Sequence, residues 1–233
     1  NNKALYAYMD GYNGDQMAEE LNMQSKHSIE KQTAHYVDCF TTVSEITNNE
    51  CRELLDKPAD VVLMNGFEDD FVPKGATFTG KRKRARSTML RVDGHDGILN
   101  KHYYDLILGE DLSVYPSYYE PWGYTPLESV AFRVPTITTD LAGFGLWVNS
   151  LKNQHGINDG VEVLHRSDYN YSEVADGIKD TVALFSTKTE AEIKEIRKRA
   201  GQVAEQALWK HFIQYYYEAY DIALRNAMKR QLK

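Results

Sequence analysis

The chain has 233 residues of ordinary globular composition, with 42% hydrophobic and 26% charged residues, which is enough for one or two domains with sizeable cores. Its formal net charge of −7 argues against a nucleic acid or an anionic membrane as the main partner. No stretch approaches the roughly 18 apolar residues of a membrane span, and no signal-peptide pattern is present. With only two cysteines, which we expect to be reduced thiols, the composition predicts a soluble cytoplasmic protein.

The first part of the chain has the strand–helix–strand order of a parallel α/β sheet. A helical pattern over 14–35 precedes a short β-branched strand over 39–43. Ser44 caps the next helix, and because Thr47 stands where a capping box has Glu or Gln, we expect a cap without the full box. A second buried strand over 60–64 follows.

A basic run over 81–86, Lys-Arg-Lys-Arg-Ala-Arg, follows an acidic one over 68–70. Like charges this close together repel one another and seek water. We therefore interpret the run as a solvated helix face or as part of a linker over 73–92, with a patch for phosphate or another polyanion as the alternative.

A discontinuity is expected near residue 92. The segment 93–97 leads through one helix over 101–108 to a strand over 112–115, whereas a doubly wound domain normally has several strands before that point. The sequence therefore predicts a missing segment near residue 92, with incomplete α/β domains on both sides. The Asp-Gly-His-Asp-Gly turn over 93–97 is interpreted as a loop rather than a metal site.

The most informative stretch is residues 115–128, Tyr-Pro-Ser-Tyr-Tyr-Glu-Pro-Trp-Gly-Tyr-Thr-Pro-Leu-Glu. A short strand runs into a kinked aromatic loop, and a helix opens near Thr125. Glu120 lies before this helix and Glu128 lies in its first turns. Ligands of α/β sheets collect at the carboxyl ends of the strands, where helix N-termini offer unpaired N–H groups to phosphate. The arrangement predicts a nucleotide-sugar site.

After this stretch, the pattern predicts strands over 136–139 and 160–164, helices over 144–151 and 172–185, and mostly helix over 188–233. An apolar stripe at helical spacing in the last segment is expected to pack in the core, and it comprises Trp209, Phe212, Ile213, Tyr216, Tyr220, Ala223 and Leu224.

The stretch 115–128 resembles the signature of the glycogen synthase family of glycosyltransferases, whose paired glutamates read here as Glu120 and Glu128. The segment 35–50 resembles the end of the family's N-terminal domain, and the spacing of aromatic residues from Trp209 onward resembles its C-terminal helix. The resemblance implies a GT-B fold, in which two Rossmann-like domains have parallel sheets with helices on both faces.

Applied to this chain, the resemblance divides it into parts. Residues 1–72 would end the N-terminal domain, 73–92 would form the linker, 93–205 would form the nucleotide-sugar-binding domain and 206–233 the long C-terminal helix. Both Rossmann-like domains would be incomplete.

The activity implied is retaining transfer of glucose from UDP-glucose or ADP-glucose to the non-reducing end of an α-1,4-glucan, without a metal or other cofactor. The partners would then be a nucleotide sugar and an α-glucan, and assembly into a homo-oligomer stays open. Two alternatives remain: another retaining GT-B glycosyltransferase, or a non-catalytic nucleotide- or glycan-binding fragment.

Two residues are candidates for catalysis. The resemblance implies that Glu120 contacts the donor glucose, where it positions the donor and stabilises charge; a nucleophilic role is the lesser option. Lys31 aligns with an arginine of the family that reaches the donor, although a lysine cannot reproduce a bidentate arginine contact.

Five residues are candidates for donor binding. Gly123 lets the backbone approach a diphosphate at the opening of the helix, and Thr125 adds a hydroxyl donor. Trp122 and Tyr124 flank this turn and could stack on the donor, or pack in the core instead. Glu128 is assigned by resemblance to the ribose hydroxyls, and a favourable charge near the helix N-terminus is the alternative.

Two features of the family are weaker here. We find no counterpart of its Arg and Lys diphosphate clamp. The arginine-rich helix that gives eukaryotic members sugar-phosphate activation is reduced to Lys194, Arg197, Lys198 and Arg199, so we do not predict that regulation. The histidines and cysteines show no metal-ligand spacing.

Overall fold

The structure is a computed structural model that describes residues 5–89, 103–152, 154 and 156–231. The segment 93–97, the discontinuity expected near residue 92 and the start of the helix expected over 101–108 lie outside these residues.

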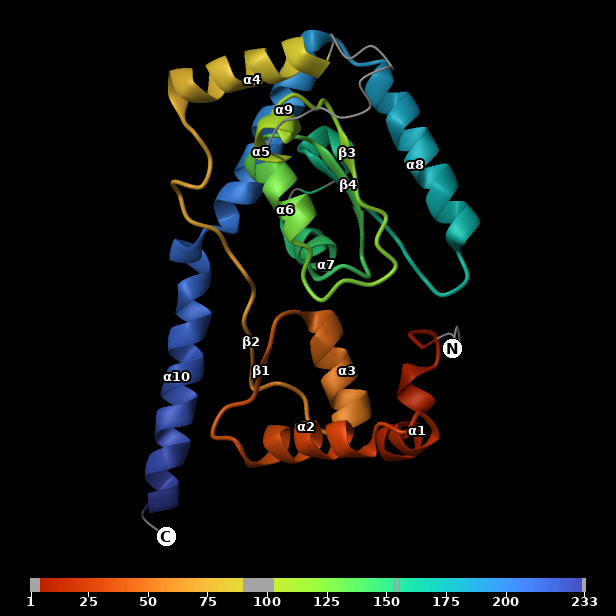
Figure 1. Cartoon of the computed structure of the whole chain (residues 1–233), viewed down its shortest axis with the longest axis vertical. Coiled ribbons are helices and arrows are strands. Elements are labelled where there is room, and N and C mark those ends of the chain that lie inside the picture. The colour runs from red at the N-terminus through yellow and green to blue at the C-terminus, as the bar shows by residue number, and fades with distance from the viewer. Residues whose placement is uncertain (1–4, 90–102, 153, 155, 232–233) are drawn as a thin grey trace.

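The elements from the N-terminus to the second strand form a first lobe, at the bottom of Figure 1. Its two short strands pair in parallel, with Thr41 opposite Val61 and Thr42 opposite Val62. Helix α3 connects the strands, which confirms the strand–helix–strand order. In chain order the elements are η1 (Met9–Gly11), α1 (Gly14–Glu20), α2 (Gln24–Tyr36), β1 (Thr41–Thr42), α3 (Glu45–Leu55) and β2 (Val61–Val62).

A second lobe is built on a parallel sheet in the order β3-β4-β5, within the part of the chain that the structure describes. Helix α6 packs on β3 and β4 and against α9, while α7 and α8 pack on β5. Its elements are α5 (Tyr103–Ile107), β3 (Ser113–Val114), α6 (Tyr124–Ala131), β4 (Thr136–Thr139), α7 (Gly143–Ser150), η2 (Ile157–Asp159), β5 (Val161–Leu164), α8 (Tyr171–Ser186) and α9 (Glu190–Gln206).

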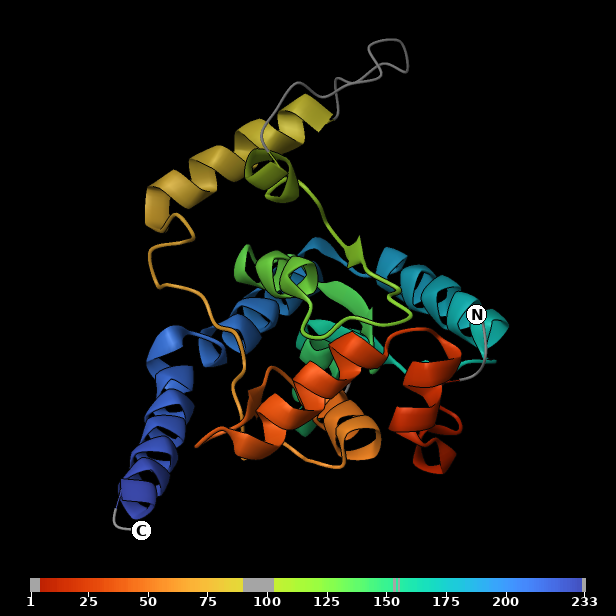
Figure 2. The same ribbon diagram turned by 60° about the horizontal axis from the view of Figure 1, so that its bottom comes forward.

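Two helices extend away from this sheet. Helix α4 (Gly75–Met89) lies at the top of Figure 1, above α9. Helix α10 (Trp209–Gln231) runs from the second lobe along the side of the first (Figures 1 and 2). The strand-like segment after β2 crosses the start of α10, because Phe67 donates to the carbonyl of Ala207 and accepts from Trp209 N–H at 3.3 and 3.1 Å. This crossing ties the first lobe to the end of the second.

The main core lies where α6, α7 and α9 meet the sheet. Its buried side chains include Trp122, Leu127, Val130, Phe144, Val148, Val161, Val203 and Phe212. Close packing of this kind fixes the loops at the sheet edge, because a well-packed core tolerates little change in shape.

Local chemistry explains two departures from the sequence-based expectations. The helix expected over 14–35 is interrupted between α1 and α2, where Asn22 adopts a left-handed φ of 56°. The cap at Ser44 is a full capping box, because the Thr47 hydroxyl accepts from Ser44 N–H and the Ser44 hydroxyl accepts from Thr47 N–H. A threonine hydroxyl thus replaces the usual carboxylate.

The apolar stripe of α10 is only partly buried, so that expectation was wrong in part. Phe212 is buried, but Tyr220 and Leu224 are 58% and 62% exposed. Helical spacing identifies the apolar face of a helix and does not identify what covers it.

Candidate functional site

The loop that follows β3 lies at the carboxyl edge of the three-stranded sheet. Because β3, β4 and β5 are parallel, the residues after each strand meet at this edge. They are Glu120 after β3, Asp140 after β4 and His165 after β5, and Nδ1 of His165 lies 2.8 Å from the Asp140 carboxylate.

Backbone hydrogen bonds hold Glu120 against the loop that follows β4. Its N–H donates to Leu141 O at 3.1 Å, and its carbonyl accepts from Gly143 N–H at the same distance. Earlier in the same loop, the carbonyl of Ser117 accepts a hydrogen bond from the Thr139 hydroxyl at 2.7 Å. The main chain around Glu120 is therefore fixed on both sides.

The Glu120 carboxylate lies next to the opening of α6. Its Oε2 accepts from the Ser117 hydroxyl at 3.2 Å and would be 3.7 Å from a Cβ built on Gly123. Gly123 has a φ of 110°, in the left-handed region that favours glycine. The turn thus brings backbone and a carboxylate together at the start of the helix.

Helices α6 and α7 both begin here, and among the described residues no side chain caps either N-terminus. At α7 the N–H groups of Gly143 and Phe144 already donate to the carbonyls of Glu120 and Trp122. A Cβ on Gly123 would lie 3.3 Å from Cβ of Phe144, so the two helix openings are adjacent. Tyr124 and Thr125 are exposed at the first turn of α6. The N–H groups at the opening of α6 and the dipole of that helix favour an anion at this position.

Glu128 lies one turn further along α6 and faces α5. Its Oε1 accepts a hydrogen bond from the Tyr104 hydroxyl at 3.0 Å, and the Tyr104 ring stacks on Phe132 with centroids 5.6 Å apart. Burial raises the pKa of Glu128, and the hydrogen bond from Tyr104 opposes that rise. A half-buried carboxylate of this kind is able to accept hydrogen bonds from ligand hydroxyls.

The Trp122 side chain belongs to the core. It is 2% exposed, and its ring lies 6.1–6.3 Å from the rings of Phe144, Trp147 and Phe212. This placement gives the indole a packing role, while its contact with a donor stays a prediction.

Lys31 makes its ion pairs with side chains of the first lobe. Its ammonium group binds Asp15 at 2.9 Å and Asp56 at 2.6 Å, which joins α2 to α1 and to the end of α3. These two carboxylates, Asp56 first, raise the pKa of Lys31. Within the described residues the structure gives Lys31 no contact with Glu120, and its catalytic role stays a prediction.

A cavity of about 1050 Å³ lies between the first lobe, α7 and α10. Trp122 and Gly143 reach it from the site just described. Its other walls carry aromatic and polar side chains that suit a sugar, and these include Glu45, Asn48, Trp147, Asn149, Tyr215 and Glu218.

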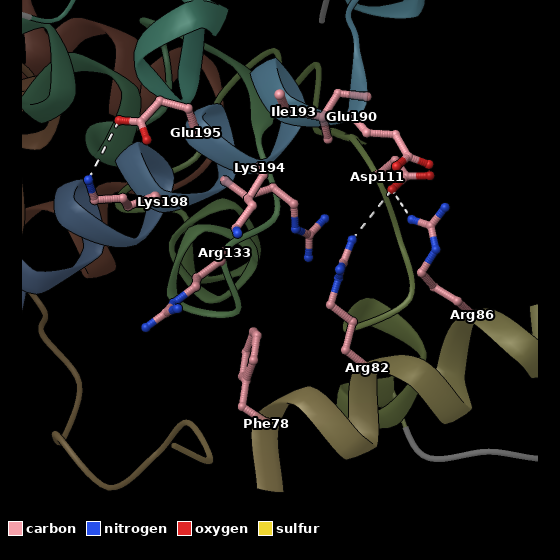
Figure 3. Close-up of a pocket in the computed structure, with 12 residues that line it drawn as sticks. Phe78, Arg82, Arg86, Asp111, Arg133, Glu190, Ile193, Lys194, Glu195 and Lys198 are labelled. Carbon is pink, nitrogen blue, oxygen red and sulfur yellow. Dashed lines mark hydrogen bonds and ion pairs between the residues drawn. The ribbon is translucent and has the colours of Figure 1, made fainter. Parts of the chain in front are cut away.

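A second cavity, of about 740 Å³, lies between α4 and α9 (Figure 3). Cationic side chains predominate in its lining, which also includes the carboxylates of Asp111, Glu190 and Glu195. Asp111 forms ion pairs with Arg82 and Arg86 of α4. The Arg197 guanidinium, from α9, is 6% exposed; its Nη1 donates to Glu110 O at 2.6 Å, whereas its Nη2 has no partner among the described residues. Burial, and next the charge of Arg82, lower the pKa of Arg197.

Sequence reasoning missed this second cavity. It favoured a solvated helix face or a linker for the basic run over 81–86, with a patch for phosphate or another polyanion as the alternative, and it treated the cations of 194–199 as a separate cluster. Only the fold brings α4 against α9, so no local pattern indicated the pairing.

Across the described residues, no helix combines the length and the apolar character needed to cross a membrane. The same part of the chain contains no group of three or more His, Cys, Asp or Glu side chains arranged to hold a metal ion.

A sequence model of the glycogen synthase family matches residues 1–73 and 91–233, and thus almost the whole chain. Glycogen [starch] synthase isoform 1 of Saccharomyces cerevisiae is 32% identical over 143 residues, which are 61% of this chain and 20% of the yeast protein. Glycogen [starch] synthase of Neurospora crassa is 32% identical over 130 residues, 56% of this chain and 18% of that protein. The chain therefore spans about a fifth of the length of the curated relatives it matches.

Among solved structures, a chain described as belonging to the crystal structure of a GtfA/B complex superposes with a TM-score of 0.51. It covers 84% of this chain and 47% of its own length at 14% sequence identity, so the likeness concerns the fold. The expected α/β class with parallel sheets of the GT-B type is confirmed. Given the match of the family's sequence model over nearly all of its length, the chain belongs to the glycogen synthase family.

Proposed function

We propose that this chain carries the nucleotide-sugar site of a retaining glucosyltransferase, which transfers glucose from UDP-glucose or ADP-glucose to the non-reducing end of an α-1,4-glucan. The observation that carries the proposal is the position of the Glu120 carboxylate beside the N-terminus of α6, which no side chain among the described residues caps. This is where a diphosphate and its sugar can be held side by side.

The leaving group is the first charge that the site must stabilise. Departure of the nucleoside diphosphate develops negative charge on its phosphate oxygens. The N–H groups at the start of α6, which no side chain among the described residues caps, would donate to those oxygens. The exposed Thr125 hydroxyl adds a donor. Because these groups are fixed by the core below them, they need little reorganisation when the charge appears.

The second charge develops on the sugar. As the glycosidic bond lengthens, the anomeric carbon becomes oxocarbenium-like, and the Glu120 carboxylate stabilises that positive charge electrostatically. The acceptor hydroxyl attacks from the face that the leaving group vacates, which retains the configuration, and the departing phosphate accepts its proton. Glu128 accepts hydrogen bonds from the ribose, with Tyr104 holding its carboxylate in place.

The glucan would occupy the cavity of about 1050 Å³ between the lobes, which opens beside Trp122 and Gly143. Its carboxylate and amide side chains can bind sugar hydroxyls, and Trp147 and Tyr215 offer faces on which sugar rings stack. We propose that no metal is needed, since the helix N-termini supply the electrostatic stabilisation. Lys31 remains a proposed second contact with the donor.

The proposal is tested by incubating the chain with labelled UDP-glucose or ADP-glucose and a maltooligosaccharide, with chain extension as the readout. Glu120→Ala is expected to abolish transfer and to leave the urea unfolding midpoint nearly unchanged. An active Glu120→Ala variant would contradict the role of this carboxylate. Donor binding without transfer would instead favour a non-catalytic nucleotide-binding fragment.

A second proposal concerns the cationic cavity between α4 and α9, which we assign to a phosphate-bearing ligand. It is supported by the buried Arg197, whose Nη2 has no partner among the described residues. An anion there would offset the cost of burying an unpaired cation. Phosphate should raise the thermal midpoint more than chloride at equal ionic strength, and Arg197→Met should remove the difference; equal effects of both salts would reject the assignment.

A further inference from the structure

Glu50, on α3 of the first lobe, binds two tyrosines from distant parts of the chain. Its Oε2 accepts a hydrogen bond from the Tyr119 hydroxyl at 3.1 Å, and its Oε1 accepts one from the Tyr6 hydroxyl at 2.7 Å. Tyr119 immediately precedes Glu120. A carboxylate of the first lobe thereby reaches the loop of the second lobe that carries the proposed catalytic group.

The two tyrosine rings also support each other. The rings of Tyr6 and Tyr119 stack with centroids 5.7 Å apart and an interplanar angle of 24°, and Tyr6 meets the edge of Tyr118 at 6.2 Å. The hydroxyls and the rings are therefore held together, so that a change at Glu50 acts on both tyrosines.

A second carboxylate completes the support from the other side. Asp168 accepts hydrogen bonds from the Tyr118 hydroxyl and, at 2.8 Å, from Ala7 N–H. The guanidinium of Arg166 lies over the Tyr118 ring at 5.2 Å. Asp168 follows β5 within the second lobe, so it holds Tyr118 without linking this residue to α3.

The hydroxyls that Glu50 binds remain donors over a wide range of pH. Burial, followed by the neighbouring Glu50, raises the pKa of both Tyr6 and Tyr119 above that of a free tyrosine. A protonated hydroxyl on a carboxylate makes a charge-assisted hydrogen bond, which is stronger than one between neutral groups. The contact is consequently suited to fixing geometry rather than to switching with pH.

We propose that Glu50 is a positioning residue for the loop that carries Glu120: by binding Tyr119 and Tyr6 it sets the position of the Glu120 carboxylate relative to the helix openings. The effect on transfer rests on the proposed function, whereas the effect on the loop rests only on the hydrogen bonds and ring contacts of Tyr119 and Tyr6. The hydrogen bonds of Glu50 go to Tyr6 and Tyr119, whereas the Glu120 carboxylate accepts from Ser117, so Glu50 acts on that carboxylate through the loop.

The rival explanation is that Glu50 only joins the two lobes. Three substitutions separate the two explanations. Glu50→Ala removes both acceptors, whereas Glu50→Gln keeps one acceptor oxygen and adds an N–H that a tyrosine oxygen can accept. Tyr119→Phe deletes one hydroxyl and keeps the ring stack. Glu53→Ala is the matched control on the same helix, because the Glu53 carboxylate pairs with Arg52 instead.

The first readout is hydrogen–deuterium exchange of the amides of Glu120 and Gly143, whose hydrogen bonds hold the loop. Glu50→Ala and Tyr119→Phe should each speed this exchange by about tenfold, a factor that corresponds to about 1.4 kcal/mol. Glu50→Gln should restore most of the protection, and Glu53→Ala should match the unaltered chain.

The second readout is donor kinetics. Glu50→Ala should lower kcat by about tenfold with little change in KM for the donor, because the helix openings that bind the diphosphate stay in place. A chain without transfer activity would contradict the proposed function, and the exchange readout would still decide the role of Glu50. Unchanged exchange in both Glu50→Ala and Tyr119→Phe overturns the inference.

Discussion

A methyl group added at Gly143 should strain the site and the contact between the lobes together. The Cβ of an alanine there would lie 2.3 Å from Pro121 O and 2.6 Å from Cβ of Ser44. One neighbour is the backbone of the Glu120 loop, and the other is the N-cap of α3 in the first lobe. Neither is the free end of a flexible side chain.

The magnitude follows from these distances. Non-bonded carbon contacts are most favourable at about 3.5–4.0 Å, so the neighbours must move by roughly 1 Å. Overpacking of this kind costs about 1–3 kcal/mol, while replacing a glycine lowers the entropy of the unfolded chain and returns about 0.4–1 kcal/mol. We expect a net loss of about 1–2 kcal/mol in the free energy of unfolding.

Urea unfolding measures this loss as a lower midpoint at an unchanged slope. Gly80→Ala is the control for the chemistry of the change, because a Cβ on Gly80, inside α4, meets nothing within 4 Å. That variant should be more stable by about 0.4–1 kcal/mol. Two substitutions of the same kind should therefore have opposite signs, and a Gly143→Ala chain as stable as the original would refute the reasoning.

Three further predictions concern single side chains. Burial raises the pKa of Glu128, so the protonated carboxyl stabilises the fold at acidic pH and this contribution is lost as pH rises through the raised pKa. Glu128→Gln, which stays neutral, should therefore be more stable relative to the original chain at pH 7 than at pH 4. Equal differences in urea midpoint at the two pH values would contradict this. Thr189→Ala should cost about 1 kcal/mol, because it removes the hydroxyl that caps α9 and leaves the backbone N–H of residue 189 on Glu192. The backbone N–H of Thr189, and next its hydroxyl, lower the pKa of Glu192, so the hydroxyl's share of this stabilisation, and with it part of the cost, is lost as pH falls. An unchanged thermal midpoint at neutral pH would count against the cap. Trp122→Phe should lower the free energy of unfolding, and the predicted contact of the indole with the donor should add a loss of about 1.4 kcal/mol in binding, measured by calorimetry. A donor affinity within about threefold of the original would contradict that contact and leave the indole a packing role alone.

The sequence was most informative where local chemistry decides the structure. The strand Thr136–Thr139 has the predicted bounds, since a β-branched run between a proline and an aspartate leaves little alternative. The helix after Ser44 was also predicted, but its capping box was not, because the pattern for that motif asks for Glu or Gln where Thr47 serves equally well.

Features that depend on distant segments were beyond local reasoning. The contact of Glu50 with Tyr6 and Tyr119 joins segments far apart in the chain, and nothing in the spacing of these residues indicates it. Burial of Tyr220 and Leu224 was expected from the helical period, yet the period says only that the two residues share a face.

The central claim, a donor site at the opening of α6, is tested most directly by calorimetric titration of the chain with UDP, UDP-glucose and ADP-glucose. We predict saturable binding of one nucleotide series and a loss of at least about tenfold in affinity for Glu128→Ala, equivalent to about 1.4 kcal/mol. Folded protein that binds none of the three, or a Glu128→Ala variant that binds as tightly as the original chain, would contradict it.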